Sequence, residues 1–364
     1  MSTNLYKSFL RLVRLGIATS KEAKIYNSID WVEMKALADE HGLSAVVLDG
    51  LDELRVKSGE LRVSSQEKIL LAEWIGEVYQ LYEQRYEQYS QAIADLAAFY
   101  NSHGYKMMVL KGYACSLDWL KPNHRPCGDI DIWLLGNQRE ADKVLTRERK
   151  IKIDNSHHHH SVFCWNNFMV ENHYDFINIH HHRSHKGLER ILKELGQDDS
   201  HYVEMNGEKV YLPSHNLHAL FLLKHTALHF VSGEISLRQI LDWGFFVEKH
   251  SNKVDWKWLL SVLDEYGLLP FFNILNAICV EELGFEMSSF PTISYNPVQK
   301  ERALNDILMG ANISVENTNV ILRQVNRFRR WKGNQWKHEL CYKDSMWSAF
   351  WSGVWSHLLK PSSI

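Results

Sequence analysis

The sequence has few features that would attach the protein to a membrane or to nucleic acid as a whole. Its formal net charge is only −3 over 364 residues, so we expect no bulk DNA binding and no general attraction to an anionic membrane surface. No apolar run approaches the length that crosses a bilayer. The apolar patch near the start is broken by arginines and lacks a small-residue cleavage site, unlike a signal peptide.

Cysteine is also scarce, and its spacing forms no pair. The five cysteines are scattered and contain no CxxC motif, which predicts free thiols in a reducing compartment. We therefore expect a cytoplasmic protein. With 45% hydrophobic and 23% charged residues, the composition is that of an ordinary folded protein, and the length predicts two or three domains.

The chain divides into three parts by the period of its apolar residues. Helical spacing dominates residues 1–103, including one long helix or two adjoining helices over 64–103. Residues 104–212 change to short apolar runs and predict a small mixed sheet, with a hairpin turn at Asn166-Asn167. Helical spacing returns over residues 213–364. The predicted fold class is α+β, a small sheet domain between N-terminal and C-terminal helical domains.

The segment RPCGDIDIWL places two aspartates on one predicted strand. Strand side chains alternate between faces, so Asp129 and Asp131 point to one side and Ile130 and Ile132 to the other. Neighbouring carboxylates repel each other and need a counter-charge. Hard carboxylate oxygens at this spacing favour Mg²⁺ or Mn²⁺, which commonly share their coordination with substrate phosphates.

Two flanking segments supply partners for these aspartates. The strand before them ends in Lys111 and Gly112, and a glycine there lets the backbone approach a phosphate closely. A later strand carries VENHYDF, whose Glu171, His173 and Asp175 share one face because they alternate. Phosphoryl chemistry with two metal ions generally needs a third carboxylate, and Glu171 or Asp175 could provide it.

These motifs, in this order, resemble the uncharacterised bacterial nucleotidyltransferase family within the superfamily related to DNA polymerase beta. That family has a helical N-terminal region, an LKG turn, an R-x-x-x-D-I-D-I strand, an acid-x-His strand and a helical H…H…LR…LD region. The superfamily's usual Gly-Ser after the first strand is replaced here by Lys-Gly-Tyr, with Ser116 one turn later. The sequence carries the series as Leu110-Lys111-Gly112, Arg125, Asp129 and Asp131, Glu171-Asn172-His173, His225 and His229, Leu237-Arg238 and Leu241-Asp242.

The resemblance implies a metal-dependent nucleotidyltransferase. It would transfer a nucleoside monophosphate from an NTP to a hydroxyl of a small molecule, a protein or a tRNA end, and release pyrophosphate. Mg²⁺ or Mn²⁺ would be held by Asp129, Asp131 and a third acid, assigned to Glu171 with Asp175 as the alternative. Lys111 and Arg125 would neutralise triphosphate charge, with Gly112 and His173 also at the substrate.

Other interpretations of the same residues remain open at this stage. The protein could be an inactive nucleotide-binding sensor or scaffold, or a metal-dependent hydrolase that uses its histidine-rich strands. The histidines at 157–160 and 180–185 are expected to line the nucleotide cleft or to be exposed, in preference to a dedicated zinc site. Arg125 could instead pair with Asp129 or Asp131. His225, His229, Arg238 and Asp242 are expected to form a polar network between helices, in which Arg238 and Asp242, four residues apart, could form an ion pair. Basic and aromatic residues at 323–336 could form an acceptor surface.

Overall fold

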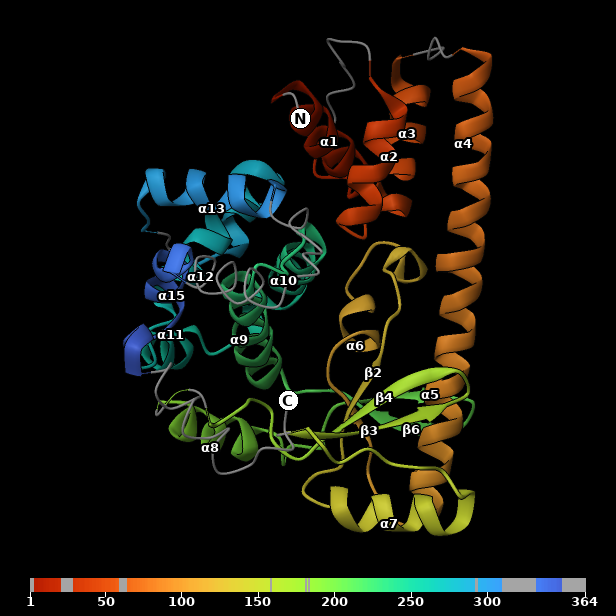
Figure 1. Ribbon diagram of the computed structural model, residues 1–364, viewed down its shortest axis with the longest axis vertical. Helices are drawn as coiled ribbons and strands as arrows, with labels where there is room; N and C mark the ends of the chain where they lie inside the picture. The colour runs from red at the N-terminus through yellow and green to blue at the C-terminus, as the bar shows by residue number, and fades with distance from the viewer. Residues whose placement is uncertain are drawn as a thin grey trace, which may run out of the picture.

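The computed structural model (Figure 1) describes residues 3–20, 29–58, 64–157, 159–180, 182, 184–291, 294–309 and 332–348. The N-terminal and linking helices are α1 (Thr3–Gly16), α2 (Trp31–Glu40), α3 (Ser44–Ser58), α4 (Ser65–Val78), the π-helical η1 (Tyr79–Gln84) and α5 (Arg85–Ser102). The strands are β1 (Met108–Val109), β2 (Ile130–Trp133), β3 (His160–Trp165), β4 (Phe168–His173), β5 (Tyr202–Met205) and β6 (Glu208–Tyr211). The helices between the strands are α6 (Tyr113–Ser116), the 3₁₀ turn η2 (Pro122–His124), α7 (Gln138–Arg149) and α8 (His185–Leu195). The C-terminal helices are α9 (His215–Ser232), α10 (Leu237–His250), α11 (Trp256–Glu265), α12 (Leu269–Ala277), α13 (Pro297–Met309) and α15 (Gln335–Cys341), with short turns at η3 (Ser251–Lys253), η4 (Ile278–Glu282) and η5 (Met287–Ser289).

The six strands form one mixed sheet in the order β3-β4-β2-β1-β6-β5. Strand β2 runs antiparallel to β1 and parallel to β4, and β1 runs parallel to β6. The hairpin predicted at Asn166-Asn167 is present between β3 and β4, and both asparagines have positive φ, as a tight hairpin turn requires. The predicted α+β fold class is confirmed.

The two faces of β2 pack against different helices. Ile130 and Ile132 are fully buried in a core that α5 and α7 build on one side of the sheet. Trp133 belongs to a second core, where its ring lies 4.4 Å from that of Phe176, and Phe176 in turn packs on Phe221 of α9. The alternation predicted for this strand therefore separates an apolar face from the face that carries Asp131 and Trp133.

The N-terminal helices are held together by a close crossing of α1 and α3. A Cβ atom on Gly16 would lie 2.0 Å from the carbonyl oxygen of Val46, and one on Gly50 would lie 1.9 Å from that of Leu12. Only glycine allows the two backbones to approach this closely, because the atoms in the way belong to the backbone and cannot rotate aside.

A long helical rod connects these N-terminal helices to the sheet. In Figure 1, α4 lies beside α2 and α3, and α5 continues the same direction until it lies against the strands. The π-helical turns of η1 join the two, which agrees with the expectation of one long helix or two adjoining ones. Side chains of α5, among them Tyr89 and Tyr100, are buried in the core that backs the sheet.

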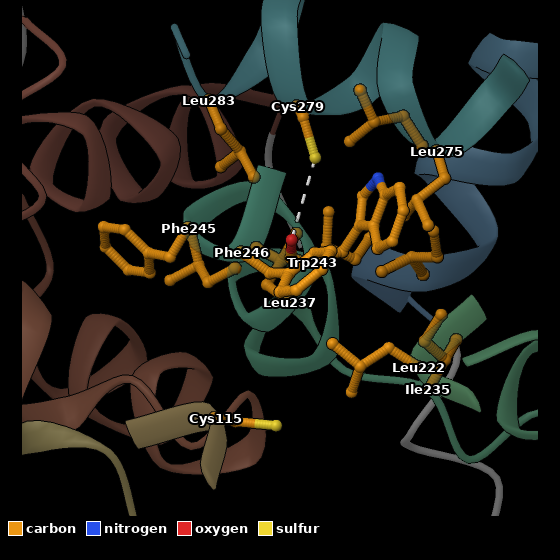
Figure 2. Close-up of a cluster of buried hydrophobic side chains, with 14 of the residues drawn as sticks. Cys115, Leu222, Ile235, Leu237, Trp243, Phe245, Phe246, Leu275, Cys279 and Leu283 are labelled. Atoms are coloured by element: carbon orange, nitrogen blue, oxygen red, sulfur yellow. Dashed lines mark hydrogen bonds between the residues drawn. The ribbon is translucent and has the colours of Figure 1, made fainter. Parts of the chain in front are cut away.

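The C-terminal helices have an apolar core of their own around α10. Figure 2 shows Trp243 and Phe246 of α10 packed among Leu222, Leu275 and other apolar side chains. Two polar groups of this core have partners: the Trp243 indole donates to Asn276, at 2.7 Å, and the Cys279 thiol points to a carbonyl of α10. This packing fixes α9 and α10, the two helices that face the site described next.

Candidate active site

The turn after β1 is fixed against the acidic strand by one tyrosine. Gly112 has φ +51°, and a Cβ there would lie 2.3 Å from the Tyr89 hydroxyl oxygen. The same hydroxyl donates a 2.8 Å hydrogen bond to the carbonyl of Asp129. Lys111 and Asp129 are thus held next to each other by the shape of the backbone, and only glycine fits at position 112.

The acidic residues of β2 and β4 lie side by side. The two strands are parallel, and their register places Asp131 directly beside Glu171 and Trp133 beside His173. Asp129 lies two residues before Asp131, just before the start of β2. The expected third acid therefore lies beside the DxD strand, and its strand position supports Glu171 over Asp175. Asp175 instead forms an ion pair with Lys193 of α8.

Asp131 is the most enclosed carboxylate of this row. Its side chain is only 3% exposed, yet Lys111 Nζ lies 2.7 Å and His173 Nε2 lies 3.0 Å from its Oδ1. Burial alone would raise the pKa of Asp131, but the charge of Lys111 and the hydrogen bond from His173 outweigh burial and lower it well below its usual range. The aspartate is therefore a charged group with two cationic partners.

The neighbouring groups respond to the same charges. Burial and the negative charge of Asp131 raise the pKa of Asp129. Burial would lower the pKa of His173, but its hydrogen bonds to Asp131 and Glu171 raise it instead. Burial would raise the pKa of Glu171, but the hydrogen bond from His173 lowers it. The three carboxylates outnumber the two cationic partners, Lys111 and His173, and the net negative charge that remains suits a divalent cation.

The side chains at this point fit a metal ion. Asp131, Glu171 and His173 each offer a donor atom, and the three atoms lie within 4.8 Å of one another. A second group of three donors at the same separation consists of His159, His160 and His173. Among the described residues, neither three-donor group includes Asp129. The structure thus brings together Lys111, Asp131, Glu171 and His173, with Asp129 and Gly112 next to them.

Arg125 has a partner that the sequence did not indicate. Its guanidinium makes two hydrogen bonds to Asp242 of α10, at 2.7 Å and 2.9 Å, and both side chains are nearly buried. The Trp119 indole donates to the same carboxylate at 2.9 Å. Arg125 therefore pairs with neither Asp129 nor Asp131, and the expected partnership of Asp242 with Arg238 is replaced by this one. The reason is tertiary: the loop before β2 reaches across to α10.

Arg238 of α10 was expected to join a polar network between helices. Its Nε is buried and makes no hydrogen bond among the residues that the structure describes. Burial and the charge of Arg125 lower its pKa, while Asp242 and Asp129 act in the opposite direction. Its side chain also passes Gly42, whose Cβ would lie 3.6 Å from it. Arg238 thus lies between the N-terminal helices and the acidic strand.

The remaining predicted residues occupy the edges of this region. His225 and His229 of α9 share a hydrogen bond of 3.0 Å between their Nε2 atoms, and burial lowers the pKa of both. Lys111 is the first nearby charge to depress the pKa of each, so α9 faces the site. The Ser116 hydroxyl is buried and shares a hydrogen bond with the Tyr86 hydroxyl.

Two further expectations concern the basic segment near the C-terminus and the absence of a membrane span. The basic and aromatic segment begins at Arg323, and residues 323–331 of it lie outside the described residues. Among the helices that the structure describes, none is both long enough and apolar enough to cross a bilayer.

Comparison with known proteins agrees with these observations. The model of a family described as uncharacterised nucleotidyltransferase matches residues 27–284, which include every residue assigned to the site. No curated protein matches the sequence. Among solved structures, an antigenic nucleotidyltransferase-like protein from Paracoccidioides brasiliensis is similar, with 14% identity, a TM-score of 0.34, and coverage of 49% of this chain and 87% of that chain. The family match spans most of the chain and all the motifs of the acidic site, and the protein belongs to this family of nucleotidyltransferases.

Proposed function

We propose that this protein transfers a nucleoside monophosphate from an NTP to a hydroxyl acceptor and releases pyrophosphate. The observation that carries the proposal is the row formed by Asp129, Asp131 and Glu171 on adjacent strands, with Lys111 beside it. A row of carboxylates with one lysine suits divalent cations together with a polyphosphate, because each balances the charge of the other.

The residues have separate roles in this reaction. We assign Asp129, Asp131 and Glu171 as ligands for Mg²⁺ or Mn²⁺. When bound, such ions lower the pKa of an acceptor hydroxyl and stabilise the charge on the leaving pyrophosphate. The acceptor oxygen forms a bond to the α-phosphorus as the bond from that phosphorus to the bridging oxygen breaks. The electron pair leaves with pyrophosphate, and the hydroxyl proton passes to a carboxylate of the row.

Positive side chains beside the row would hold the triphosphate. Lys111 already lies against Asp131, and the backbone turn at Gly112 holds it there. Arg238 adds a guanidinium with a buried, unpaired Nε near Asp129, so we assign it to the triphosphate as well. Arg125 was expected in this role; its bond to Asp242 favours a structural role, and its contact with substrate stays a prediction.

The flanking helices are the proposed source of the acceptor pocket. We propose the division into residues 1–103, 104–212 and 213–364, with the sheet domain between two helical domains. Helix α5, the last helix of the first division, packs on the sheet and so joins the first two divisions. The acceptor class, whether a small molecule, a protein or a tRNA end, follows from the shape of these helical parts. The five free cysteines support a cytoplasmic reaction.

The test is a transfer assay with α-labelled ATP, GTP, CTP and UTP, Mg²⁺ or Mn²⁺, and cell extract as the source of acceptor. We expect label to move onto one class of acceptor with the wild-type protein. The double variant Asp129→Asn, Asp131→Asn should lose at least about a hundredfold in rate. The matched control, Asp198→Asn with Asp199→Asn, removes two acids outside the site and should keep the wild-type rate. NTP binding without any transfer would reject the proposal and leave a nucleotide-binding sensor.

A further inference from the structure

The carboxylate row is continued by histidines at one end of the sheet. Antiparallel pairing places His160 of β3 beside His173 of β4, on the face that also carries Glu171. The ring of His160 lies 5.3 Å from that of His173 and 4.3 Å from that of His159, which precedes β3. The two groups of three donors, one mostly carboxylate and one all imidazole, share His173.

His173 is already oriented as a metal ligand. Its Nε2 points to the carboxylates, 3.0 Å from Asp131 Oδ1 and 3.5 Å from Glu171 Oε2. Its Nδ1 lies 3.3 Å from the backbone carbonyl of Asp175. A metal-binding histidine usually donates its second ring N–H to a carbonyl or carboxylate, which fixes the tautomer that leaves the other nitrogen free. The carbonyl of Asp175 does this for Nδ1, so Nε2, which donates to Asp131 in the metal-free protein, would give up its proton and bind the ion.

His160 adds a second nitrogen without another evident function. It is 6% exposed, and its Nδ1 has no hydrogen-bond partner among the described residues. Its Nε2 lies 3.7 Å from Glu171 Oε1. A buried polar atom without a partner costs about 1–3 kcal/mol, so the buried position of His160 is not explained by the hydrogen bonding of its Nδ1. His159 likewise has a buried Nδ1 without a described partner.

We propose that the metal centre of this protein is a mixed carboxylate–imidazole centre, in which Asp131, Glu171, His173 and His160 bind a transition-metal ion or Zn²⁺ in preference to Mg²⁺. This proposal rests on the proposed function, because it concerns the same carboxylates. Imidazole nitrogen suits Fe²⁺, Ni²⁺, Cu²⁺ and Zn²⁺, whereas Mg²⁺ prefers oxygen ligands and keeps several waters. His159 lies next to this set and completes the imidazole group.

The proposed centre requires His160 to move toward Asp131, Glu171 and His173, because the structure places it in the second group of donors. Zinc binds nitrogen at about 2.0–2.1 Å, so two donors on a tetrahedral ion lie roughly 3.4 Å apart. The separations from Nε2 of His173 to the two carboxylates are already 3.0 Å and 3.5 Å, and that from His160 to Glu171 is 3.7 Å. Lys111 now shares Asp131 Oδ1 with His173, and binding of the ion would move Lys111 from Asp131 toward a phosphate.

Direct metal binding tests this centre without any turnover. Metal-free protein is titrated with Co²⁺, read by visible absorption, and separately with Mg²⁺, read by calorimetry. We expect Co²⁺ to bind at least about tenfold more tightly than Mg²⁺. The variant His173→Gln replaces the nitrogen with an oxygen and should lower that ratio by about tenfold or more, as should His160→Gln. His201→Gln, which removes a histidine outside both donor groups, should leave the ratio unchanged.

The outcomes separate this centre from the transfer activity. Equal affinity for the two ions, or a Co²⁺ spectrum unaffected by both His173→Gln and His160→Gln, would overturn the mixed centre even if nucleotidyl transfer is found. Circular dichroism of each variant distinguishes a lost ligand from a lost fold. Conversely, tight Co²⁺ binding that depends on these histidines would support the centre even if no NTP is consumed, and only the proposed function would then fail.

Discussion

The ion pair of Arg125 and Asp242 is the contact whose removal tests the arrangement of the site most directly. We expect Arg125→Met to reduce the free energy of unfolding by about 3–5 kcal/mol, because it leaves the Asp242 carboxylate buried without its counter-charge. Both side chains are nearly buried, at 8% and 6% exposure, and two hydrogen bonds are lost together. Methionine keeps the length and apolar volume of the side chain, so the effect reports on charge and hydrogen bonding.

A double-mutant cycle isolates the pair from other effects. Asp242→Leu alone should also destabilise, since Arg125 loses its partner and the Trp119 indole loses its acceptor. The double variant Arg125→Met, Asp242→Leu should be more stable than the sum of the single effects predicts, by at least about 2 kcal/mol. Urea denaturation followed by tryptophan fluorescence measures all four proteins. Calorimetric ATP binding is measured on the folded Arg125→Met protein in parallel.

Two results would refute this reasoning. A loss below about 1 kcal/mol in Arg125→Met would mean that the buried pair contributes no more than a surface pair. A folded Arg125→Met protein of near wild-type stability that binds ATP at least about tenfold more weakly would return Arg125 to the triphosphate. In our interpretation its ATP affinity stays within about threefold of the wild type.

Three further predictions follow from single positions. Gly112→Ala should lower the transfer rate at least about tenfold, because the added Cβ forces the Tyr89 hydroxyl off the Asp129 carbonyl. Gly128→Ala is the control, since a Cβ there meets nothing within 4 Å, and it should keep the wild-type rate. Equal transfer rates in the two variants would contradict the role of Gly112 in this turn. Gly50→Ala should destabilise the protein by about 3 kcal/mol or more in a thermal melt, because its Cβ meets the backbone of α1. Gly76→Ala, on an open helix surface, should stabilise it by about 1 kcal/mol. Similar changes in stability for the two variants would refute the close crossing of α1 and α3. Burial lowers the pKa of His41 to about 4, so the folded state disfavours the charged ring and stability should fall as the pH drops from about 6.5 towards 4. His41→Asn, which can still accept from the Leu237 N–H, should show a weaker fall over that window in urea denaturation, and an unchanged slope would contradict the assignment.

Local patterns predicted the parts of this fold that depend on neighbouring residues in the chain. The alternation of Asp129, Ile130, Asp131 and Ile132 predicted two unlike faces, and the structure buries the isoleucines against α5 and α7. The Asn166-Asn167 turn predicted the β3–β4 hairpin. The same kind of signal, Asn206-Gly207, marks the β5–β6 hairpin and was not used, although both residues have positive φ.

Contacts between distant parts of the chain could not be predicted from the sequence. Nothing near Arg125 in the sequence indicates Asp242, which lies 117 positions away, and Arg238 seemed the natural partner because it is one helical turn from that aspartate. Tyr89 gave no signal at all, since its role depends on how α5 docks on the sheet. The histidines at 157–160 were noticed, but only strand register shows that His160 meets His173. In each case packing decided the partner, and pattern alone carries no such information.

Lys111 determines whether the protein must bind a metal ion before it can fold. Many metal centres gather like charges that repel one another until the ion arrives, and such chains fold only when loaded. Here a lysine in the turn after the adjacent strand already neutralises the most buried acid, at 2.7 Å from Asp131. The chain can therefore complete its folding before it binds a cation. The Lys111 ammonium occupies the place beside Asp131 until a metal ion binds there. Chelators would then empty the centre and leave the scaffold intact, so that loading can be reversed many times in the life of one molecule.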